Sequence, residues 1–135
     1  MNSPALLQAD TRLPSEAAAT VEVFRAHRKW VVASHMNPDG DTLGSAVALK
    51  QLLRAMGHEV RHFCPDVPPR SLAFLCGIEE VETSLPDGGD WAIATCDAAD
   101  LSRFGDKWID RLKAAEVLVV VDHHISNQAF GTHNL

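Results

Sequence analysis

The sequence predicts an α/β fold in which a doubly wound parallel sheet is flanked by helices. Two observations lead to this fold class. Short apolar runs alternate with amphipathic helical patterns along the 135 residues, as they do where right-handed crossovers join parallel strands. The runs are apolar at successive positions, which is typical of strands buried on both faces of a parallel sheet. The length suffices for one domain with a hydrophobic core, since domains commonly have about 100–150 residues.

The N-terminal part of the chain predicts one helix and one buried strand. Apolar residues at helical spacing follow Pro14 and predict a helix over residues 15–27. The arm that precedes this helix is expected to be loose. The apolar run at residues 31–34 predicts a buried strand. Pro38 and Gly40 then exclude a regular element, so a loop follows this strand.

The middle of the chain predicts a second helix, a second strand and an irregular stretch. The helix over residues 42–56 has an apolar face at helical spacing and ends at Gly57. Alternation of apolar and polar residues predicts a strand over residues 58–63. In the irregular stretch we expect a short helical piece at residues 72–76 and a short strand at residues 81–83.

The C-terminal part predicts two buried strands, at residues 91–96 and 116–121, on either side of a helix at residues 106–115. The last residues resemble the start of a further strand. We therefore divide the chain into an N-terminal arm and helix, residues 1–28, and an α/β domain, residues 29–135. The sheet of this domain is expected to be incomplete at its C-terminal end.

Composition excludes several classes of protein. The net charge is −6, which argues against a protein that coats nucleic acids through clustered Lys and Arg. The sequence has no run of about 18 apolar residues, so it predicts no membrane span. The N-terminus lacks the pattern of a secretory signal. Cys64, Cys76 and Cys96 form no C-x-x-C pair. We therefore expect reduced, mostly buried thiols in a cytoplasmic protein that has no membrane partner.

Acidic and histidine residues follow three of the four long predicted strands. The carboxyl ends of parallel strands lie at one edge of a sheet, where ligands bind in open α/β folds. We therefore expect these side chains to meet in one pocket. They are His35, Asp39 and Asp41 after the first strand, Asp97 after the third, and Asp122, His123 and His124 after the last.

The residue types at these strand ends indicate a divalent metal site. Carboxylate oxygens and imidazole nitrogens together favour Mn²⁺, Mg²⁺ or Zn²⁺ over a cysteine-rich structural zinc site. Carboxylates crowded in one pocket repel one another, and a pair of divalent cations would remove this repulsion. Two cations about 3.5–4 Å apart can act together on a phosphate and on an attacking water.

Each of these residues also has a purely structural interpretation. Asp41 could be the N-cap of the helix that follows it. Asp97 and Asp122 could be turn residues, and His35 could be a hydrogen-bonded core histidine. These interpretations do not explain why three strands end in metal-ligand types, and the cap role of Asp41 is compatible with metal binding.

The same residues resemble the motifs of a known enzyme family, the DHH phosphoesterases. Three segments in the family's order carry the resemblance, which covers most of the chain. They are His35–Asp41 with Gly44 and Ser45, Asp97 with Asp100 and Arg103–Gly105, and Asp122–His124 with Asn127, Phe130 and Gly131. In detail they are most similar to the branch of bifunctional oligoribonucleases and 3′-phosphoadenosine-5′-phosphate (pAp) phosphatases. RecJ-type exonucleases and family II pyrophosphatases are more distant in pattern.

The resemblance implies a site for two Mn²⁺ ions, with Mg²⁺ as the alternative metal. His35 and Asp39 would hold one ion. Asp41 and His123 would hold the other, and Asp97 would bridge both. The implied reaction is hydrolysis of phosphate esters by a two-metal mechanism, with short RNA or DNA oligonucleotides or pAp as substrates.

The resemblance also implies roles for the residues around the two ions. His124 would act in catalysis by facing the substrate phosphate and stabilising charge in the transition state. Asp122 would support the residues of the cluster without binding a metal ion itself. The resemblance implies supporting roles, or positions close to the substrate phosphate, for Ser45, Arg103 and Asn127.

Members of the family carry two further parts after these motifs. One is an acidic motif with a last metal ligand, and the other is a nucleotide-binding DHHA1 domain. The chain ends at Leu135, before both parts. We therefore expect an N-terminal fragment without DHHA1 that binds metal weakly and shows little or no turnover. A homodimer is expected only for the full-length protein.

Two other functions remain open at this point. One is an inorganic pyrophosphatase of the family II type. The other is a non-catalytic module that binds nucleotide or metal, which the absence of the later acidic ligand favours. A dinucleotide-binding Rossmann domain is excluded, because no Gly-x-Gly-x-x-Gly pattern follows the first strand.

Overall fold

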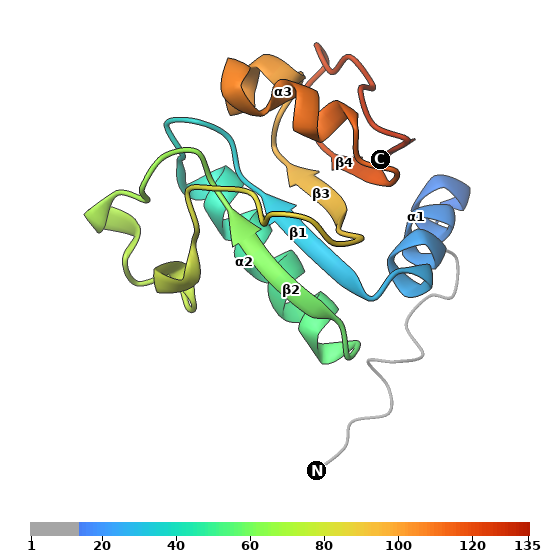
Figure 1. Ribbon diagram of the computed structural model, residues 1–135, viewed down its shortest axis with the longest axis horizontal. Helices are drawn as coiled ribbons and strands as arrows, with labels where there is room; N and C mark the ends of the chain where they lie inside the picture. The colour runs from blue at the N-terminus through green and yellow to red at the C-terminus, as the bar shows by residue number, and fades with distance from the viewer. Residues whose placement is uncertain (1–13) are drawn as a thin grey trace.

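The computed structural model describes residues 14–135 and shows a sheet of five strands in the order β2-β1-β3-β4-β5 (Figure 1). All four neighbouring pairs of strands run parallel. The strands are β1 (Lys29–Ala33), β2 (Glu59–Phe63), β3 (Ala92–Cys96), β4 (Leu118–Val121) and β5 (His133–Asn134). The predicted parallel sheet is therefore confirmed. The N-terminal arm expected from the sequence lies outside the described residues.

Helices cover both faces of this sheet. Within residues 14–135, α1 and α2 pack on one face and α3 packs on the other (Figure 1). The α-helices are α1 (Ser15–Ala26), α2 (Gly40–Ala55) and α3 (Asp106–Lys113), and the short 3₁₀ helices are η2 (Arg70–Leu72), η3 (Ile78–Glu80) and η4 (Leu101–Phe104). None of the helices in this range is long and apolar enough to cross a membrane. The predicted doubly wound arrangement is confirmed.

Alternate side chains of β1 enter two separate cores. Trp30 and Val32 pack in the core under α1 and α2, which includes Phe24. Val31 packs in the core under α3, which includes Leu112. The three side chains from β1 are at most 1% exposed. Burial on both faces explains why this strand is a continuous apolar run in the sequence.

The irregular segment between β2 and β3 differs from the sequence prediction. The helical piece expected at residues 72–76 is replaced by the earlier 3₁₀ helix η2, whose N-cap is Pro69, and residues 73–76 form turns and a bend. A proline at this position fixes its own φ and offers no N–H, and the helix that follows lasts a single turn. The strand expected at residues 81–83 is reduced to one parallel bridge between Phe63 and Glu82.

The loops that leave β1 and β3 diverge at the carboxyl ends of these two adjacent strands. From β1 the chain runs through α2 to β2, on one side of the sheet order. From β3 it runs through α3 to β4, on the other side and over the opposite face. Such a topological switch point is where open α/β sheets bind their ligands. The polar residues after β1 and β3 therefore occupy the position that this fold uses for binding.

A close backbone contact at Gly131 holds the short strand β5 beside β4. A Cβ added to Gly131 would lie 2.6 Å from the carbonyl oxygen of Leu118 and 2.8 Å from that of His133. The ladder extends past β5, where the N–H of Leu135 donates to the carbonyl of Val120 at 2.8 Å. Only glycine permits this approach of the two backbones.

We predict that Gly131→Ala lowers the free energy of unfolding by about 1–3 kcal/mol, because overpacking a close contact destabilises by this amount. Gly44→Ala is the matched control. Gly44 lies within α2, and a Cβ added there meets no neighbouring atom within 4 Å. This control should raise the free energy of unfolding by about 0.5–1 kcal/mol through helix propensity. Urea unfolding measures both changes, and an unaltered stability of Gly131→Ala would contradict this packing of β5.

Candidate metal centre

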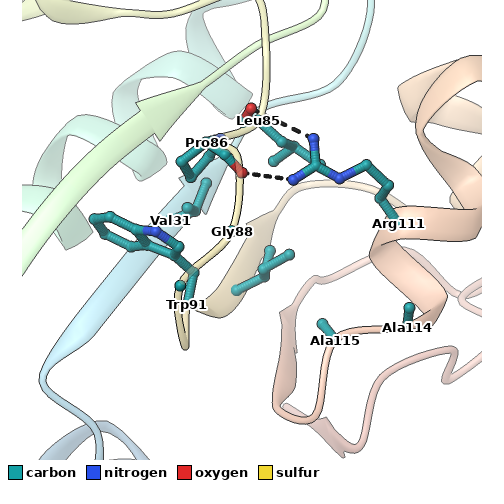
Figure 2. Close-up of a pocket in the computed structure, with 10 residues that line it drawn as sticks. Val31, Leu85, Pro86, Gly88, Trp91, Arg111, Ala114 and Ala115 are labelled. Carbon is teal, nitrogen blue, oxygen red and sulfur yellow. Dashed lines mark hydrogen bonds between the residues drawn. The ribbon is translucent and has the colours of Figure 1, made fainter.

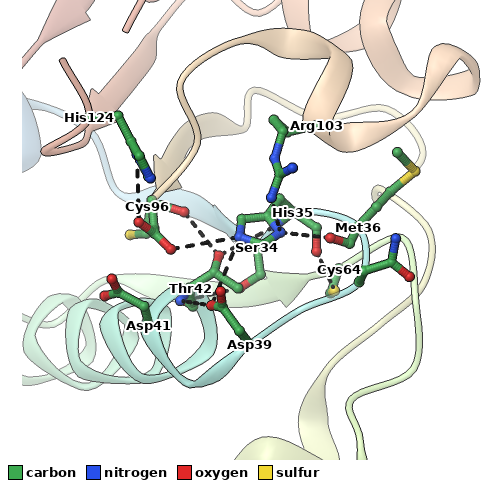
Figure 3. Close-up of polar contacts among 12 residues, drawn as sticks. Ser34, His35, Met36, Asp39, Asp41, Thr42, Cys64, Cys96, Arg103 and His124 are labelled. Atoms are coloured by element: carbon green, nitrogen blue, oxygen red, sulfur yellow. Dashed lines mark hydrogen bonds and ion pairs between the residues drawn. The ribbon is translucent and has the colours of Figure 1, made fainter. Parts of the chain in front are cut away.

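The loops after β1, β3 and β4 bring all seven strand-end residues together at one edge of the sheet. Figure 3 shows four of them, His35, Asp39, Asp41 and His124. Two groups have ligand atoms within 4.8 Å of one another, and Asp97 belongs to both. The groups are His35, Asp39 and Asp97, and Asp97, Asp122, His123 and His124. Asp41 joins them through a 3.3 Å approach of its carboxylate to Nε2 of His123. The parallel sheet thus places residues from distant parts of the sequence side by side.

Asp97 lies at the centre of this cluster, and its two carboxylate oxygens face different histidines. Oδ1 is 2.9 Å from Nε2 of His123, and Oδ2 is 3.7 Å from Nε2 of His35. Asp97 is only 8% exposed, so its charge needs close partners to offset the loss of hydration. A carboxylate whose oxygens face two separate sets of ligand atoms has the arrangement of a bridging metal ligand.

The backbone of Asp97 is strained. Its φ is 62°, in the left-handed region, which costs a non-glycine residue roughly 1–2 kcal/mol. Aspartate and asparagine tolerate this region better than other residues with a Cβ. The N–H of Asp97 donates to the carbonyl of Val121 at 3.1 Å, which helps to hold the strained conformation. Strain of this kind is concentrated at functional sites.

His35 is 2% exposed, and its ring is oriented by the contact of Nδ1 with the carbonyl oxygen of Met36 at 2.7 Å. In the neutral ring the proton therefore lies on Nδ1, and the lone pair of Nε2 faces carboxylates. Nε2 is 3.7 Å from Oδ2 of Asp97 and 4.0 Å from Oδ1 of Asp39. These distances are too long for hydrogen bonds. A lone pair that faces two carboxylates is repelled unless a cation lies between them.

Arg103 lies beside His35 (Figure 3). Its Nη2 is 3.4 Å from Nδ1 of His35, but Nδ1 donates its proton to Met36 over the shorter distance and cannot also accept from Arg103. The carbonyl of Arg103 accepts a hydrogen bond from the N–H of Met36 at 2.7 Å. This bond fixes η4 against the loop after β1. The exposed guanidinium of Arg103 is thus placed at the rim of the cluster and is available for an anion.

The N-cap of α2 is Asp39 and not Asp41, which corrects the structural alternative suggested by the sequence. Oδ1 of Asp39 accepts a hydrogen bond from the N–H of Thr42 at 3.0 Å. Asp41 lies one position inside the helix, and its side chain is 57% exposed. The start of the helix therefore does not require the carboxylate of Asp41, which points toward His123 instead.

Asp122 supports two neighbouring side chains from a buried position. Its side chain is 1% exposed, and Oδ1 lies 2.6 Å from Nδ1 of His124. Oδ2 accepts a hydrogen bond from Nδ2 of Asn127 at 2.8 Å. Burial alone would raise the pKa of Asp122, but the hydrogen bonds from Asn127 and His124 outweigh it and hold the pKa below its ordinary value. Asp122 is thus ionised and keeps a proton on Nδ1 of His124, which leaves Nε2 for another partner.

His123 has the most exposed side chain of the seven strand-end residues, at 69%. Its Nε2 lies 2.9 Å from Oδ1 of Asp97 and 3.3 Å from Oδ2 of Asp41. The hydrogen bond with Asp97 is the main cause that raises the pKa of His123 above 6.5, and the charge of Asp41 adds to it. A metal ligand must be the neutral imidazole, so a cation at this position would compete with the proton on Nε2.

The cysteines contribute no thiolate to the cluster. All three are free thiols, with Cys64 and Cys96 buried and Cys76 exposed. Burial raises the pKa of Cys64 to about 11 and that of Cys96 to about 12, so both are neutral at pH 7. The donors available in the cluster are therefore carboxylate oxygens and imidazole nitrogens, which suit Mn²⁺, Mg²⁺ or Zn²⁺.

Two cavities lie on either side of Asp97, and its side chain lines both. One has a volume of about 300 Å³ and includes Arg103 and His124 in its wall. The other has a volume of about 340 Å³ and includes Ser45 and His123. Asp97 thus lies between two cavities. His124 lines one of them and His123 lines the other.

A further cavity of about 210 Å³ lies away from the cluster, near the starts of β3 and β4 (Figure 2). Its wall holds Trp91 and Ile93 but none of the carboxylates and histidines described above. The guanidinium of Arg111 in its wall donates to the carbonyl oxygens of Leu85 and Pro86, at 3.4 and 2.5 Å. This cavity therefore lacks the chemistry of the candidate metal centre.

Comparisons with known proteins find relatives for most of the chain. Residues 29–134 match the profile described as "DHH family, N-terminal domain". The chain is 30% identical over 101 residues to the "Bifunctional oligoribonuclease and PAP phosphatase NrnA" of Bacillus subtilis. It is 34% identical over 103 residues to a protein of the same name from Thermus thermophilus. The alignments cover 75% and 74% of this chain, and 31% and 29% of these relatives, so the chain spans less than a third of their length.

Two other similarities concern a different activity and the fold. The chain is 31% identical over 102 residues to a "Probable manganese-dependent inorganic pyrophosphatase" of Streptococcus mutans, covering 71% of this chain and 31% of that protein. Its fold matches the crystal structure of an exopolyphosphatase-related protein from Bacteroides fragilis with a TM-score of 0.80. That match covers 94% of this chain and 40% of the other, at 23% identity, and it supports the fold alone.

We predict that, in the metal-free chain, Asp97→Asn lowers the pKa of His123 toward 6.5, because it removes the main group that raises this pKa. Because folding raises the pKa of His123, protonation of this ring stabilises the folded chain below pH 6.5. This contribution to the free energy of unfolding is lost as the pH rises through the pKa of His123 in the folded chain. An NMR titration of the His123 ring in chelator-treated protein measures the shift. Asp110→Asn, which alters an exposed carboxylate on α3, should leave the titration unchanged. An equal pKa of His123 in Asp97→Asn and the parent would contradict this pairing.

Proposed function

The chain belongs to the DHH family of phosphoesterases, and on this premise we propose that it hydrolyses phosphate esters of short oligonucleotides and of pAp with two bound Mn²⁺ ions. The proposed substrates follow from the names of the Bacillus and Thermus relatives. The proposed metal follows from the donor set of the cluster and from the manganese-dependent Streptococcus relative. Because the chain spans less than a third of these relatives, the activity of the whole protein is part of the proposal.

The observation that carries the proposal is the position of Asp97 between two histidines. His35 and His123 face different oxygens of its carboxylate, and each has a second carboxylate nearby, Asp39 for His35 and Asp41 for His123. One ion would be held on the His35 side and the other on the His123 side, with Asp97 shared. When bound, two divalent cations neutralise phosphate oxygens and favour ionisation of an attacking water.

We assign His124 to the substrate phosphate. Its Nδ1 is held by the ionised carboxylate of Asp122, so the ring is fixed in one orientation. Its side chain is 45% exposed, and Nε2 remains to contact a phosphate. When Nε2 is protonated, it donates a hydrogen bond to a phosphate oxygen on which charge develops. It can also give that proton to the leaving oxygen as a general acid.

We assign Arg103 to the binding of the phosphate as well. Its guanidinium lines the same cavity as His124, and its backbone is fixed against the loop after β1. Arginine binds phosphate through paired N–H groups, which orients the anion as well as attracting it. This cation lies next to the cluster in a chain of net charge −6, so it supplies local attraction for an anionic substrate.

Ser45 and Asn127 receive different supporting roles. Ser45 is exposed in the first turns of α2 and lines the cavity on the His123 side, where its hydroxyl can meet the substrate. Asn127 donates to Asp122 and accepts a hydrogen bond from the N–H of Ala129 at 2.7 Å. We therefore propose that Asn127 acts through Asp122 and His124 and does not contact the substrate directly.

An inorganic pyrophosphatase is the second candidate function, because the chain is 31% identical to the Streptococcus relative of that name. The residues around Asp97 do not separate the two candidates, since both act on a phosphate held at divalent cations. A third possibility is a module that binds metal or nucleotide without turnover. A comparison of substrates with and without Mn²⁺ therefore decides among the three.

We predict that the chain binds Mn²⁺ in calorimetry and that Asp97→Asn weakens binding at least about 100-fold, because Asp97 would contribute to both ions. Asparagine preserves the size of the side chain and tolerates the positive φ at this position. Asp110→Asn is the matched control and should bind Mn²⁺ as the parent does. Mn²⁺ affinity that is unaffected by Asp97→Asn, in folded protein, would rule out Asp97 as a shared ligand.

We also predict that the whole protein hydrolyses pAp and a dinucleotide in preference to pyrophosphate when Mn²⁺ is supplied. His124→Asn should lower kcat about 10²–10⁴-fold, the range for loss of a general acid or base, and should largely preserve Mn²⁺ binding. Phosphate release with the three substrates measures the preference. Turnover of pyrophosphate alone would support the second candidate, and Mn²⁺ binding without any turnover would support the non-catalytic module.

A further inference from the structure

The hydroxyl of Thr42 joins the two loops that carry the buried members of the cluster. Thr42 is 0% exposed and lies in the first turn of α2. Its Oγ1 donates to the carbonyl oxygen of Cys96 at 3.0 Å, and it is 3.4 Å from the backbone nitrogen of His35 (Figure 3). Cys96 is the residue before Asp97, so one hydroxyl contacts the backbone on both sides of the divergence between β1 and β3.

The backbone of Thr42 reaches the rest of the same loop. Its N–H donates to Oδ1 of Asp39 at 3.0 Å, and its carbonyl oxygen lies 3.4 Å from Oγ of Ser34. Ser34 is in turn 2.9 Å from Nε2 of the buried His62 on β2. Thr42 thus contacts the segment around His35, the carboxylate of Asp39 and the peptide that leads into Asp97.

The hydroxyl of Thr42 takes the place of a ladder hydrogen bond where β1 and β3 separate. The two strands pair in register up to Ala33 and Thr95. Beyond this point Oγ1 lies between the N–H of His35 and the carbonyl of Cys96 and can bond to both. A single hydroxyl group therefore lies between the two loops and contacts the backbone of both.

The same contact fixes the peptide group that leads into the strained residue. The carbonyl of the Cys96–Asp97 peptide accepts from Thr42, and its N–H donates to the carbonyl of Val121 at 3.1 Å. This peptide is thus held at both ends, directly before the positive φ of Asp97. Strained conformations persist where surrounding contacts determine them strongly, and these two hydrogen bonds supply such contacts.

We propose that Thr42 is a positioning residue whose hydroxyl sets the separation and orientation of His35 and Asp97. Its role in metal binding rests on the proposed function, whereas its role in ordering the two loops does not. Thr42 itself is not expected to bind a metal ion, because its hydroxyl is fully buried and faces backbone groups. In the sequence, Thr42 is marked only as the first residue of the helix predicted over residues 42–56.

The test compares variants that differ in one hydroxyl group. Thr42→Val replaces the hydroxyl with a methyl group of similar size, and Thr42→Ser restores the hydroxyl. Thr95→Val is the matched control, because Thr95 is also fully buried, lies on β3, and has a hydroxyl without a hydrogen-bond partner in the described chain. If Thr42→Val does not fold, Thr42→Ala and Thr42→Ser form a second pair that differs in the hydroxyl alone.

Amide hydrogen exchange of the metal-free chain gives the first readout. We expect Thr42→Val to speed exchange of the His35 and Asp97 amides about tenfold or more, while the core amides of Val32 and Val119 are unchanged. Thr42→Ser should restore protection, and Thr95→Val should not alter it. Unchanged exchange at both His35 and Asp97, or an equal rise at all four amides, overturns the proposal.

Mn²⁺ binding gives the second readout. We expect Thr42→Val to weaken Mn²⁺ affinity about 10–100-fold, the range for residues that orient metal ligands, with recovery in Thr42→Ser. Parent-like affinity in Thr42→Val overturns the link to metal binding. If the parent chain itself binds no Mn²⁺, the proposed function fails, and the exchange measurement still decides whether Thr42 orders the two loops.

Discussion

The crowding of carboxylates around one buried aspartate is the constraint on which the rest of the site depends. Asp97 is almost fully buried, and the carboxylates of Asp39, Asp41 and Asp122 lie within reach of the same histidines. Without metal, a proton on His123 and the hydrogen bonds to Asp122 offset part of this charge. Nε2 of His35 faces the carboxylates of Asp39 and Asp97 at distances too long for hydrogen bonds. Cations between these groups would remove the repulsion, which is why we place metal ions there.

The fold produces this crowding through the divergence of two loops at adjacent parallel strands. The chain leaves β1 and β3 in opposite directions along the sheet, so the residues after both strands are free of the ladder and can face one space. Their positions are then determined by polar contacts from the supporting elements. Thr42 and Val121 hold the peptide before Asp97, and Asp122 orients the ring of His124. These hydrogen bonds orient the site residues after the sheet has brought the loops together.

Much of this arrangement could be predicted from the sequence because parallel sheets follow simple rules. Continuous apolar runs such as residues 30–33 indicate burial on both faces, and the acidic residues after them must then share one edge. The local hydrogen bonds could not be predicted in this way. Asp39 and Asp41 are both suitable N-caps by type, and only the path of the loop makes Asp39 the cap. The hydroxyl of Thr42 contacts Cys96, which is distant in the sequence, so no spacing pattern predicts this hydrogen bond. The hydrogen bond of Asn127 with Asp122 is local, but it depends on the path of the loop after β4.

Crystals of the chain grown with Mn²⁺, with anomalous scattering recorded at the manganese edge, test the central claim most directly. We expect two anomalous peaks about 3.5–4 Å apart, one on each side of the Asp97 carboxylate, near His35 and near His123. Anomalous peaks elsewhere on the molecule, with Asp97 still hydrogen-bonded to His123 and no density between its oxygens and the two histidines, would contradict it.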